Sequence, residues 1–413
     1  MGKQDKKIYI MVAIALCGLM GSSVGVGLNT AGLFFTSVSN GLGISRGAIS
    51  FTYTIVSLVS ALTAMVLPKI LNTKTFKPIV FMGSLMLVGG TALQAICYST
   101  ITLYLFNLIR GIGLGLLHFV MVTFVLNNWF KAKYSVIASV VLSFSGIPGA
   151  LLSGTITSVI VSSGWRIGYL FVAGIMLVFN LPALLLPITL YPKDCGMKAY
   201  GEGNVQQSAK NYDEQEVFHY TLPSYLFLLV FAILAASLPS VTSHIPSYAE
   251  SIHFSAIVGA LTLSFCMAMN IFSKILFGIL SDKIGTKYTV FVMCGMNFIS
   301  AVLLLNASST GILLTGSFLY GTIYGATTTG NVLITKELYK NSYDKAFPLI
   351  NFLGAVFGAI ATVLFGVLYD QTGSYHMMFI LVLIFQVINI LSVNFAYIAR
   401  KKERANAHRT KGI

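Results

Sequence analysis

Long apolar stretches are the feature that most constrains this chain. A helix that crosses a bilayer needs about 20 mostly apolar residues, because each residue adds about 1.5 Å along the helix axis. The sequence contains twelve such stretches, which cover approximately residues 8–37, 46–70, 78–98, 100–126, 135–160, 166–190, 221–247, 255–281, 288–306, 311–335, 345–369 and 375–399. They predict an all-α membrane protein with 12 transmembrane helices.

Composition excludes other classes of protein. Only 9% of the residues are charged and 56% are hydrophobic, whereas a soluble domain carries roughly 25% charged residues. An ordinary soluble enzyme, a disordered protein and a coiled coil are therefore excluded. The sequence has no Gly-x4-Gly-Lys-Ser/Thr loop and no metal or nucleophile constellation, so we predict no enzyme, no ATP-driven pump and no cofactor. The five cysteines are interpreted as reduced packing residues.

Basic residues set the predicted orientation, since Lys and Arg concentrate on the cytoplasmic side of membrane proteins. With the N-terminus inside, the cytoplasmic segments hold most of the 26 Lys and Arg residues, and the external ends keep only Arg46 and Arg166. We therefore predict a multi-pass protein of the cytoplasmic membrane with both termini in the cytoplasm. The formal net charge of +14 is interpreted as topology and attraction to anionic lipid, not as nucleic-acid binding.

A polar connection divides the spans into two groups of six. The predicted organisation is an N-terminal six-helix half (1–190), a cytoplasmic central loop (191–220), a C-terminal six-helix half (221–400) and a basic cytoplasmic tail (401–413). A repeated loop supports two pseudo-repeat halves, because the polar and basic positions of 278–287 match those of a degenerate copy at 68–77. Duplicated halves with a site at their interface are a common arrangement in transporters.

The loop with Gly278, Asp282, Lys283, Gly285 and Lys287 resembles the signature loop of the major facilitator superfamily. In that family the first copy is usually the stronger one, and here it is degenerate. The resemblance implies the superfamily fold. It also implies a cytoplasmic gate at Gly278, Asp282, Lys283 and Gly285, in which the aspartate pairs with a basic residue and a helix N-terminus.

Further marks resemble one branch of the superfamily, that of oxalate/formate antiporters and monocarboxylate transporters, over nearly the whole chain. These marks are Asn128-Trp129-Phe130, Gly164-Trp165-Arg166, the segment 191–201, which begins Tyr-Pro-Lys-Asp-Cys-Gly, and His244-Ile-Pro-Ser-Tyr248.

Two basic residues lie at membrane depth, where a charge is costly and marks a functional site. No Asp or Glu falls inside a predicted span, whereas Arg110 and Lys274 do. Lys274 is either a cation that faces a water-filled cavity or a snorkelling lysine. Arg110 either binds substrate or bonds carbonyls of a neighbouring helix. A cavity with up to two positive charges and no carboxylate favours an anionic substrate.

The resemblance implies more about these positions. Lys274 stands where the family has a basic residue, commonly Arg, that binds the substrate carboxylate. Monocarboxylate carriers have a Lys at the position of Asn29 and an Asp at that of Asn270, and oxalate-type antiporters have a second basic residue at that of Gly354. The reduced charge favours a monoanion over a dianion and removes the family's Lys/Asp route for proton coupling.

Other polar residues in the spans are further candidates. His118 is a candidate proton carrier, or a neutral histidine bonded to a neighbouring helix. His244 is a candidate for gating, substrate contact or proton coupling, or a hydrated interfacial residue. A polar stripe spaced for one helix face, together with one residue of the next span, either lines the cavity or joins helices. It comprises Tyr320, Tyr324, Thr328 and Asn331, with Asn351 in the next span.

The predicted function is secondary active transport of a small organic anion, a monocarboxylate, by alternating access, as proton symport or anion exchange. Lys274 and Arg110 attract the carboxylate, and the apolar part of the cavity contacts the organic part. The expected partners are this anion, protons or a counter-anion, and the lipid bilayer, for a monomeric chain that binds no nucleic acid. Two alternatives stay open: a transporter-like sensor without transport, and a multidrug-type efflux carrier.

Overall fold

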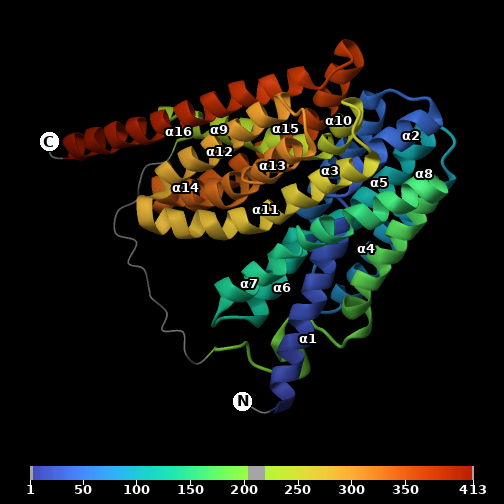
Figure 1. Ribbon diagram of the computed structural model, residues 1–413. Coiled ribbons are helices and arrows are strands. Elements are labelled where there is room, and N and C mark those ends of the chain that lie inside the picture. Colours follow the sequence, from blue (N-terminus) through green and yellow to red (C-terminus); the bar gives the residue numbers. More distant parts are fainter. Residues whose placement is uncertain (1–2, 203–218, 412–413) are drawn as a thin grey trace. The chain divides into compact units, whose positions relative to one another are not determined.

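Helices form nearly all of the structure (Figure 1), a computed structural model that describes residues 3–202 and 219–411. Its α-helices are α1 (Lys3–Met20), α2 (Phe35–Leu42), α3 (Arg46–Ile70), α4 (Phe76–Leu93), α5 (Thr100–Leu117), α6 (Phe119–Trp129), α7 (Tyr134–Ser143), α8 (Ile147–Leu185), α9 (Pro223–Ser237), α10 (Ile245–Ser251), α11 (Ala256–Ile284), α12 (Thr286–Leu305), α13 (Thr310–Tyr320), α14 (Asn331–Leu338), α15 (Tyr343–Thr372) and α16 (His376–Lys411). Short π or 3-10 segments are η1 (Gly21–Val26), η2 (Ala31–Phe34), η3 (Gln94–Ile96), η4 (Pro192–Cys195), η5 (Leu238–Ser243), η6 (Gly325–Gly330) and η7 (Lys340–Ser342). Within the described ranges no strand forms, and Phe130 and Tyr200 make an isolated bridge.

All twelve predicted spans are helical. By length and composition, ten helical segments of the described chain are suited to cross a membrane. One of them, Val136–Leu185, has 50 residues and bends at Gly164, where φ is 84° and ψ is 160°, so it provides two crossings. The run 311–335 is missing from the ten because it is divided among α13, η6 and α14. The predicted all-α class is therefore confirmed, although α8 ends at Leu185 and not near residue 190.

Several spans are interrupted in their middle. The first contains the π segment η1 and a turn over residues 27–30, and the fourth breaks at His118, where ψ is −167°. The seventh contains η5 and the tenth contains the π segment η6. A single regular helix over 311–335 is therefore a wrong expectation. Such breaks release backbone groups from the helical pattern and are frequent at functional sites.

The chain divides into two compact units. The first consists of Met1–Ala209 and Ser255–Ser264, and the second of Lys210–Phe254 and Phe265–Ile413. The four-part division at 190, 220 and 400 stays a prediction. Much of its central loop (203–218) and the end of its tail (412–413) lie outside the described residues.

In the first unit, α5 packs along α3 and α4 through glycines. A Cβ atom on Gly113 would lie 2.3 Å from the backbone nitrogen of Leu87, and one on Gly115 would lie 2.6 Å from the carbonyl oxygen of Ser60. A Cβ on Gly90 would likewise lie 2.8 Å from the backbone nitrogen of Arg110. Backbone therefore contacts backbone along this seam, which holds Arg110 close to α4.

We expect Gly113→Ala to destabilise the protein by about 1–3 kcal/mol, because the new methyl group meets backbone that cannot rotate away. Gly89→Ala in α4 is the matched control, since a Cβ there has no heavy atom within 4 Å. The control should be neutral or stabilise by up to about 1 kcal/mol, because alanine favours the helix. Thermal unfolding of the two purified variants in detergent measures the difference, and equal midpoints would contradict this account of the seam.

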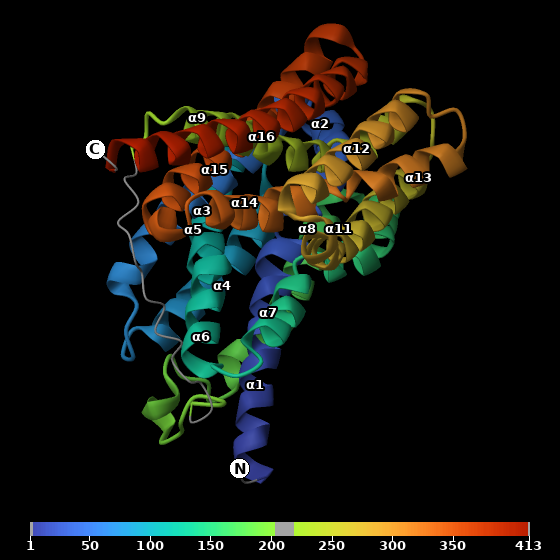
Figure 2. The same ribbon diagram turned by 90° about the vertical axis from the view of Figure 1, so that its left-hand side faces the viewer.

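In the second unit, α9 packs against α15 and α16, and α12 packs against α13 and α16 (Figure 2). Buried amides connect these helices across the apolar interior. Gln386 Nε2 donates to Asn297 Oδ1 at 2.5 Å, and Asn297 Nδ2 donates to the carbonyl of Tyr320 at 3.0 Å. Hydrogen bonds of this kind join helices in a bilayer, where helix association gains little from the hydrophobic effect.

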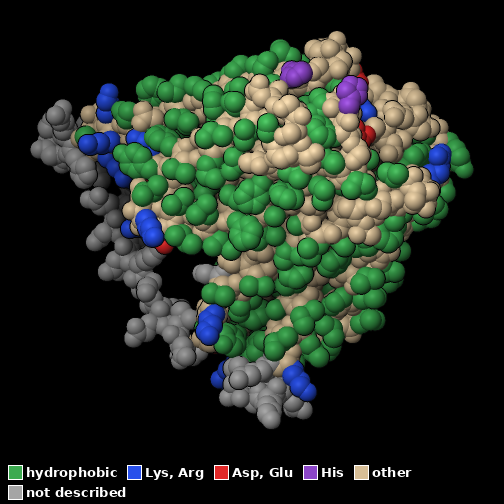
Figure 3. Space-filling model, in the orientation of Figure 1, with side chains coloured by type: hydrophobic (Ala, Val, Ile, Leu, Met, Phe, Trp, Pro, Cys, Tyr) green, Lys and Arg blue, Asp and Glu red, His purple; other side chains and the backbone are tan. Residues whose placement is uncertain are grey.

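The outer surface is apolar. Hydrophobic side chains cover most of the face drawn in Figure 3, and few charged side chains interrupt its middle. Large apolar residues project outward from several helices, with Ile101, Leu151 and Leu185 all more than 70% exposed. A soluble protein rarely exposes apolar surface of this extent, whereas lipid tails solvate it well.

Candidate functional site

Arg110 lies in the middle of the fourth span and is only 7% exposed. Its Nη2 donates to the carbonyl of Gly27 in the break of the first span, and its Nη1 donates to Asn107 Oδ1 at 3.4 Å. Its Nε is buried and has no hydrogen-bond partner among the described residues. The side chain thus makes the carbonyl contact of a structural arginine and still presents one buried N–H that a ligand can satisfy.

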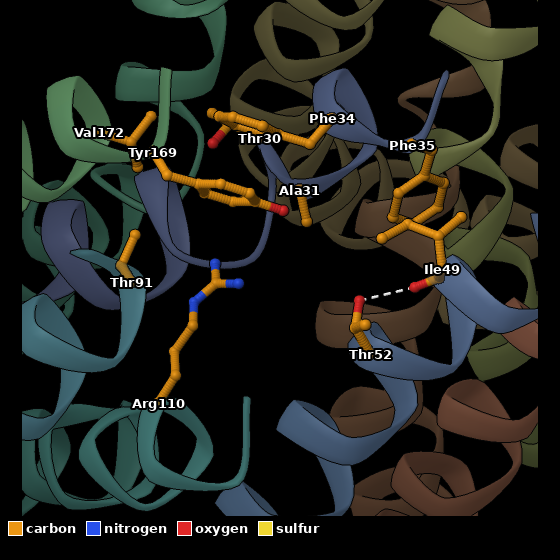
Figure 4. Close-up of a pocket in the computed structure, with 10 residues that line it drawn as sticks. All are labelled: Thr30, Ala31, Phe34, Phe35, Ile49, Thr52, Thr91, Arg110, Tyr169 and Val172. Atoms are coloured by element: carbon orange, nitrogen blue, oxygen red, sulfur yellow. Dashed lines mark hydrogen bonds between the residues drawn. The ribbon is translucent and has the colours of Figure 1, made fainter. Parts of the chain in front are cut away.

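The guanidinium of Arg110 projects into a pocket of the first unit and points toward Tyr169 and Ala31 (Figure 4). The pocket is lined by Thr30, Ala31, Phe34, Phe35, Ile49, Thr52, Thr91, Arg110, Tyr169 and Val172. The free volume of this pocket is only about 10 Å³, which is enough for a single water molecule. The pocket is therefore closed around the cation in this conformation, and a larger ligand needs the walls to separate.

Aromatic rings form one wall beside the arginine. Phe34 and Tyr169 stack with centroids 4.1 Å apart, and Trp165 meets Tyr169 edge-on at 6.0 Å. Tyr169 and Tyr53 are close enough to Arg110 for electrostatic interaction. The lining contains one formal positive charge, three threonine hydroxyls and no carboxylate. Since a guanidinium matches a carboxylate in shape and charge, this pocket is suited to a small organic anion.

The two other candidates of the first unit, Asn29 and His118, lie at helix breaks. Asn29 Nδ2 donates to the carbonyl of Ser145 at 2.6 Å, which joins the break of the first span to the turn 144–146 between α7 and α8. His118 separates α5 from α6 and is half-exposed. Its ring makes no hydrogen bond within residues 3–202 and 219–411, so the bonded alternative for this histidine is not observed.

Lys274 lies half-buried in α11, ten residues before the helix ends at Ile284, or about 15 Å along the axis. Asn270 lies one turn earlier on the same helix face and is 1% exposed. The amide nitrogen of Asn270 contacts Met267 Sδ at 3.6 Å, and its Oδ1 lacks a partner within the described chain. A buried acceptor thus lies one turn from Lys274, and buried acceptors usually have a partner.

The tenth span approaches α11 beside these residues. A Cβ on Gly321 would lie 2.3 Å from the carbonyl oxygen of Cys266, and one on Gly325 would lie 2.7 Å from that of Ser273. Ser273 Oγ donates to the carbonyl of Gly321 at 3.2 Å. This contact places the start of the π segment η6 against the turn of α11 that carries Asn270 and Lys274.

The polar residues of the tenth span do not share one environment. Tyr320 is fully buried and its hydroxyl donates to the carbonyl of Leu238 at 3.0 Å. Tyr324 is half-buried with its hydroxyl 3.0 Å from Thr242 Oγ1, whereas Thr328 is exposed and Asn331 is buried. The expected single face is wrong, because the π segment after Tyr324 changes the angular spacing of the residues that follow.

Two candidate positions from the sequence lie in the eleventh predicted span, 345–369. Asn351 in α15 is exposed. Gly354 is buried, and a Cβ there would lie 3.1 Å from the Cβ of Ala236 in α9. In the resembled oxalate-type antiporters, a second basic residue stands at the position of Gly354. In this chain, the close approach of α9 leaves little room for a long side chain toward that helix.

His244 is fully buried between η5 and α10. Its Nε2 lies 3.0 Å from the carbonyl oxygen of Thr362 in α15, and its ring contacts those of Tyr375 and Phe365. The alternative of a hydrated interfacial residue is therefore wrong, because the turn formed by η5 directs this side chain inward. Its role in gating or proton coupling stays a prediction.

The gate residues predicted from the signature loop lie where α11 meets α12. Gly285 has φ 84° and ψ 155°, a conformation that favours glycine. Gly278, Asp282 and Lys283 belong to the last turns of α11, and the latter two are exposed. Neither charged side chain forms an ion pair with another residue that the structure describes. The gating role stays a prediction.

Two of the segments that carry the family resemblance pack against each other after α6 and α8. Trp129 Nε1 donates to the carbonyl of Thr189 at 2.8 Å, and Asn128 Nδ2 donates to that of Leu190 at 3.2 Å. The backbone nitrogen of Tyr200 donates to the carbonyl of Trp129 at 2.8 Å. The segment 128–130 and the segment 191–201 thus form one structural unit that anchors the chain after α8.

Sequence reasoning missed most of the pocket around Arg110. Thr30, Thr52, Thr91 and Tyr169 come from four different spans and share no motif. The one sequence signal is the position of Tyr169, one helical turn after Trp165 in the mark Gly164-Trp165-Arg166.

Comparisons with known proteins agree with this architecture. The family model described as "Major Facilitator Superfamily" matches residues 11–362. Monocarboxylate transporter 12 of Rattus norvegicus is 24% identical over 400 residues, covering 90% of this chain and 82% of the relative, and that of Homo sapiens is 24% identical over 387 residues, covering 86% and 74%.

Solved transporters share the fold at low sequence identity. A D-xylose-proton symporter superposes with a TM-score of 0.71 at 13% identity, covering 94% of this chain and 97% of the symporter. A mutant of the nucleoside transporter NupG superposes with a TM-score of 0.64 at 14% identity, covering 96% and 99%. Together with the family model, these matches confirm the predicted fold of twelve helices, a non-enzymatic transporter and a multi-pass membrane protein: this chain belongs to the Major Facilitator Superfamily.

Proposed function

We propose that this protein is a secondary active transporter of a small organic monoanion, with monocarboxylates as the substrate class. The observation that carries the proposal is the buried Arg110 in a pocket whose lining holds no carboxylate. A fixed cation at membrane depth without an acidic neighbour attracts an anion and repels cations. The relatives named monocarboxylate transporter 12 support the same substrate class.

The distribution of acidic residues supports a single negative charge on the substrate. In the described spans, the acidic residues Asp282, Asp370 and Glu403 lie within about one turn of a helix or span end. No carboxylate of these spans thus lies at mid-span. Arg110 would orient the carboxylate with its guanidinium, and the wall of Phe34 and Tyr169 would contact the organic part. The positive charge of Lys274 in α11 is proposed to take part in transport of the same anion.

Alternating access is the proposed mode of transport. The pocket at Arg110 is too small for a carboxylic acid in the closed conformation, so binding requires its walls to move. The interrupted spans supply places where a helix can bend without losing further hydrogen bonds. The coupling is either proton symport, with His118 or His244 as proton carriers, or anion exchange. The proposed location is the cytoplasmic membrane, with both termini and the residues of the predicted gate on the cytoplasmic side.

Counterflow in proteoliposomes tests this proposal. Liposomes that contain the purified protein are loaded with one unlabelled carboxylate from a panel, and entry of the same labelled compound is followed with and without a pH gradient. We expect transient accumulation for monocarboxylates and little for dicarboxylates. Protein-free liposomes and a panel of organic cations are the controls.

Each other outcome has a distinct meaning. Saturable binding of a monocarboxylate without counterflow would identify a sensor and contradict transport. Counterflow of cations or neutral dyes in place of carboxylates would identify a multidrug-type carrier. Accumulation that depends on the pH gradient indicates proton symport, and accumulation that depends only on the internal anion indicates exchange.

A further inference from the structure

The second unit contains a pocket that includes none of the residues assigned to the substrate. It is lined by Lys287, Glu337, Leu338, Tyr397, Ile398, Arg400, Lys401 and Arg404, which come from α12, α14 and α16. Its volume is about 380 Å³, within the range of roughly 300–1,000 Å³ that is typical of small-ligand sites. The pocket therefore has room for a polar headgroup, unlike the closed space at Arg110.

Positive charge dominates this pocket. Four of its lining residues are basic and one, Glu337, is acidic. The Glu337 carboxylate accepts a hydrogen bond from the Tyr397 hydroxyl at 2.9 Å, so one of its oxygens already has a partner. Glu403 pairs with Arg400 at 3.3 Å, and the cluster remains positive even when this second carboxylate is counted. The net charge favours an anionic ligand.

The arginines build the rigid wall of the pocket. Arg400 Nε and Arg404 Nη2 both donate to the carbonyl of Leu338, at 2.9 and 2.8 Å, where α14 ends. Arg400 also lies over the ring of Tyr339 at 4.5 Å and is 4% exposed. The cations thus bind the negative end of the helix dipole, and α16 is held against α14.

The lysines are the groups placed to contact a ligand. Lys401 is exposed and Lys287 is half-exposed, and neither lies within 4 Å of a carboxylate of the described chain. Lys287 Nζ lies 5.7 Å from the ring centroids of Tyr397 and Phe291, and this lysine lines the pocket. An ammonium group with three donors suits a phosphate oxygen.

The pocket lies where two apolar spans end. It includes Lys287 at the start of the span Thr286–Leu305 and Tyr397 to Arg404 near the end of the span His376–Asn406. Ile398 in its lining and Tyr288 beside it are 41% and 59% exposed. Figure 3 shows Lys and Arg side chains gathered toward the C-terminal end of α16. A basic pocket beside lipid-exposed apolar residues fits the boundary between the headgroups and the acyl chains.

We propose that this pocket binds the phosphate of an anionic phospholipid headgroup through Lys287 and Lys401, with Arg400 and Arg404 as its positive wall. The acyl chains extend along the exposed apolar surface beside Ile398. Phosphate is the chemistry that the pocket recognises, and the apolar surface next to it favours a lipid over free phosphate.

Short-chain lipids test the proposal on the purified full-length protein in a non-ionic detergent. The thermal unfolding midpoint is measured against increasing dioctanoyl phosphatidylglycerol, dioctanoyl phosphatidylcholine and inorganic phosphate, because a ligand of the native state raises the midpoint according to its affinity. We expect phosphatidylglycerol to raise it saturably and the two other compounds to have little effect at equal concentration. Equal effects of inorganic phosphate would overturn the lipid source, and equal effects of phosphatidylcholine would overturn the preference for an anion.

Variants locate the site. K287Q/K401Q should weaken the apparent affinity for phosphatidylglycerol about 30-fold, since each basic residue near a membrane contributes about fivefold. K287R/K401R should retain most of the affinity, and K69Q/K74Q, which removes two exposed lysines of the first unit, should leave it unchanged. Equal losses in K69Q/K74Q and K287Q/K401Q would show diffuse charge attraction and overturn the site. If the double variant unfolds early without lipid, K401Q alone, at an exposed position, should still lose about fivefold.

Discussion

Replacing Lys274 by glutamine is expected to lower kcat/KM for monocarboxylate uptake at least about 30-fold, while the protein remains folded in membranes. Glutamine keeps the length and polarity of the side chain but removes the positive charge at the middle of α11. A buried charge contact between ligand and protein is worth about 2–5 kcal/mol when one partner is truncated, which corresponds to at least this loss. Initial rates of labelled monocarboxylate uptake into proteoliposomes measure it.

Two comparison variants separate charge from structure at this position. Lys274→Arg keeps the charge and should retain measurable transport, although the planar guanidinium changes the geometry of carboxylate contact. Lys345→Gln removes an exposed lysine at the start of α15 and should leave the kinetics unchanged. Normal saturable uptake by Lys274→Gln would remove Lys274 from the substrate site and support a lysine whose ammonium group only reaches toward the interface.

Replacing Arg110 is expected to have the second large effect, and it distinguishes a binding role from a structural one. Arg110→Gln should lose at least about 30-fold in kcat/KM, because the pocket then holds no positive charge. Arg110→Lys keeps a cation that can donate to the carbonyl of Gly27, so it should remain folded. It loses the planar fork for the carboxylate, and its KM should therefore rise. Uptake kinetics and the unfolding midpoint without substrate are measured for each variant.

Arg166→Gln is the matched control for the Arg110 variants. Arg166 is also a partly buried arginine of the first unit, and its Nη2 donates to the carbonyl of Cys97 at 2.9 Å. It does not line the pocket. Its loss should lower the unfolding midpoint with little change in KM. If Arg110→Lys lowers the unfolding midpoint as Arg110→Gln does and both keep a normal KM, the arginine is a structural residue alone.

Much of the fold is predictable because a membrane imposes one rule along the whole chain. Apolar length determines which segments cross, and eleven of the twelve span positions need only this rule together with the kink at Gly164. The exception is 311–335, whose composition resembles the others while its backbone is divided among α13, η6 and α14. The division lies where Gly321 and Gly325 approach α11 closely, which is a contact between distant residues that local sequence does not encode.

The candidate site likewise contains residues that the sequence identifies and residues that it does not. Arg110 and Lys274 are identifiable from the sequence, because a charge is conspicuous among apolar residues. Tyr169, Thr30 and Thr52 are not, since tyrosine and threonine occur throughout the spans. They become part of a site only because α5 approaches its neighbours through glycine and directs Arg110 toward them. For His244, the sequence left a hydrated interfacial residue open as one alternative, and the structure buries the ring.

The sequence by itself determined the helical class, the number of crossings and the two cations at membrane depth, because these follow from transfer free energies of single residues and from their order along the chain. Only the tertiary structure decided which groups surround Arg110, where the spans break, and that the basic end of α16 encloses a pocket with α12 and α14. Those features are set by backbone contacts and carbonyl hydrogen bonds between residues far apart in the chain, which depend on packing geometry and leave no local pattern.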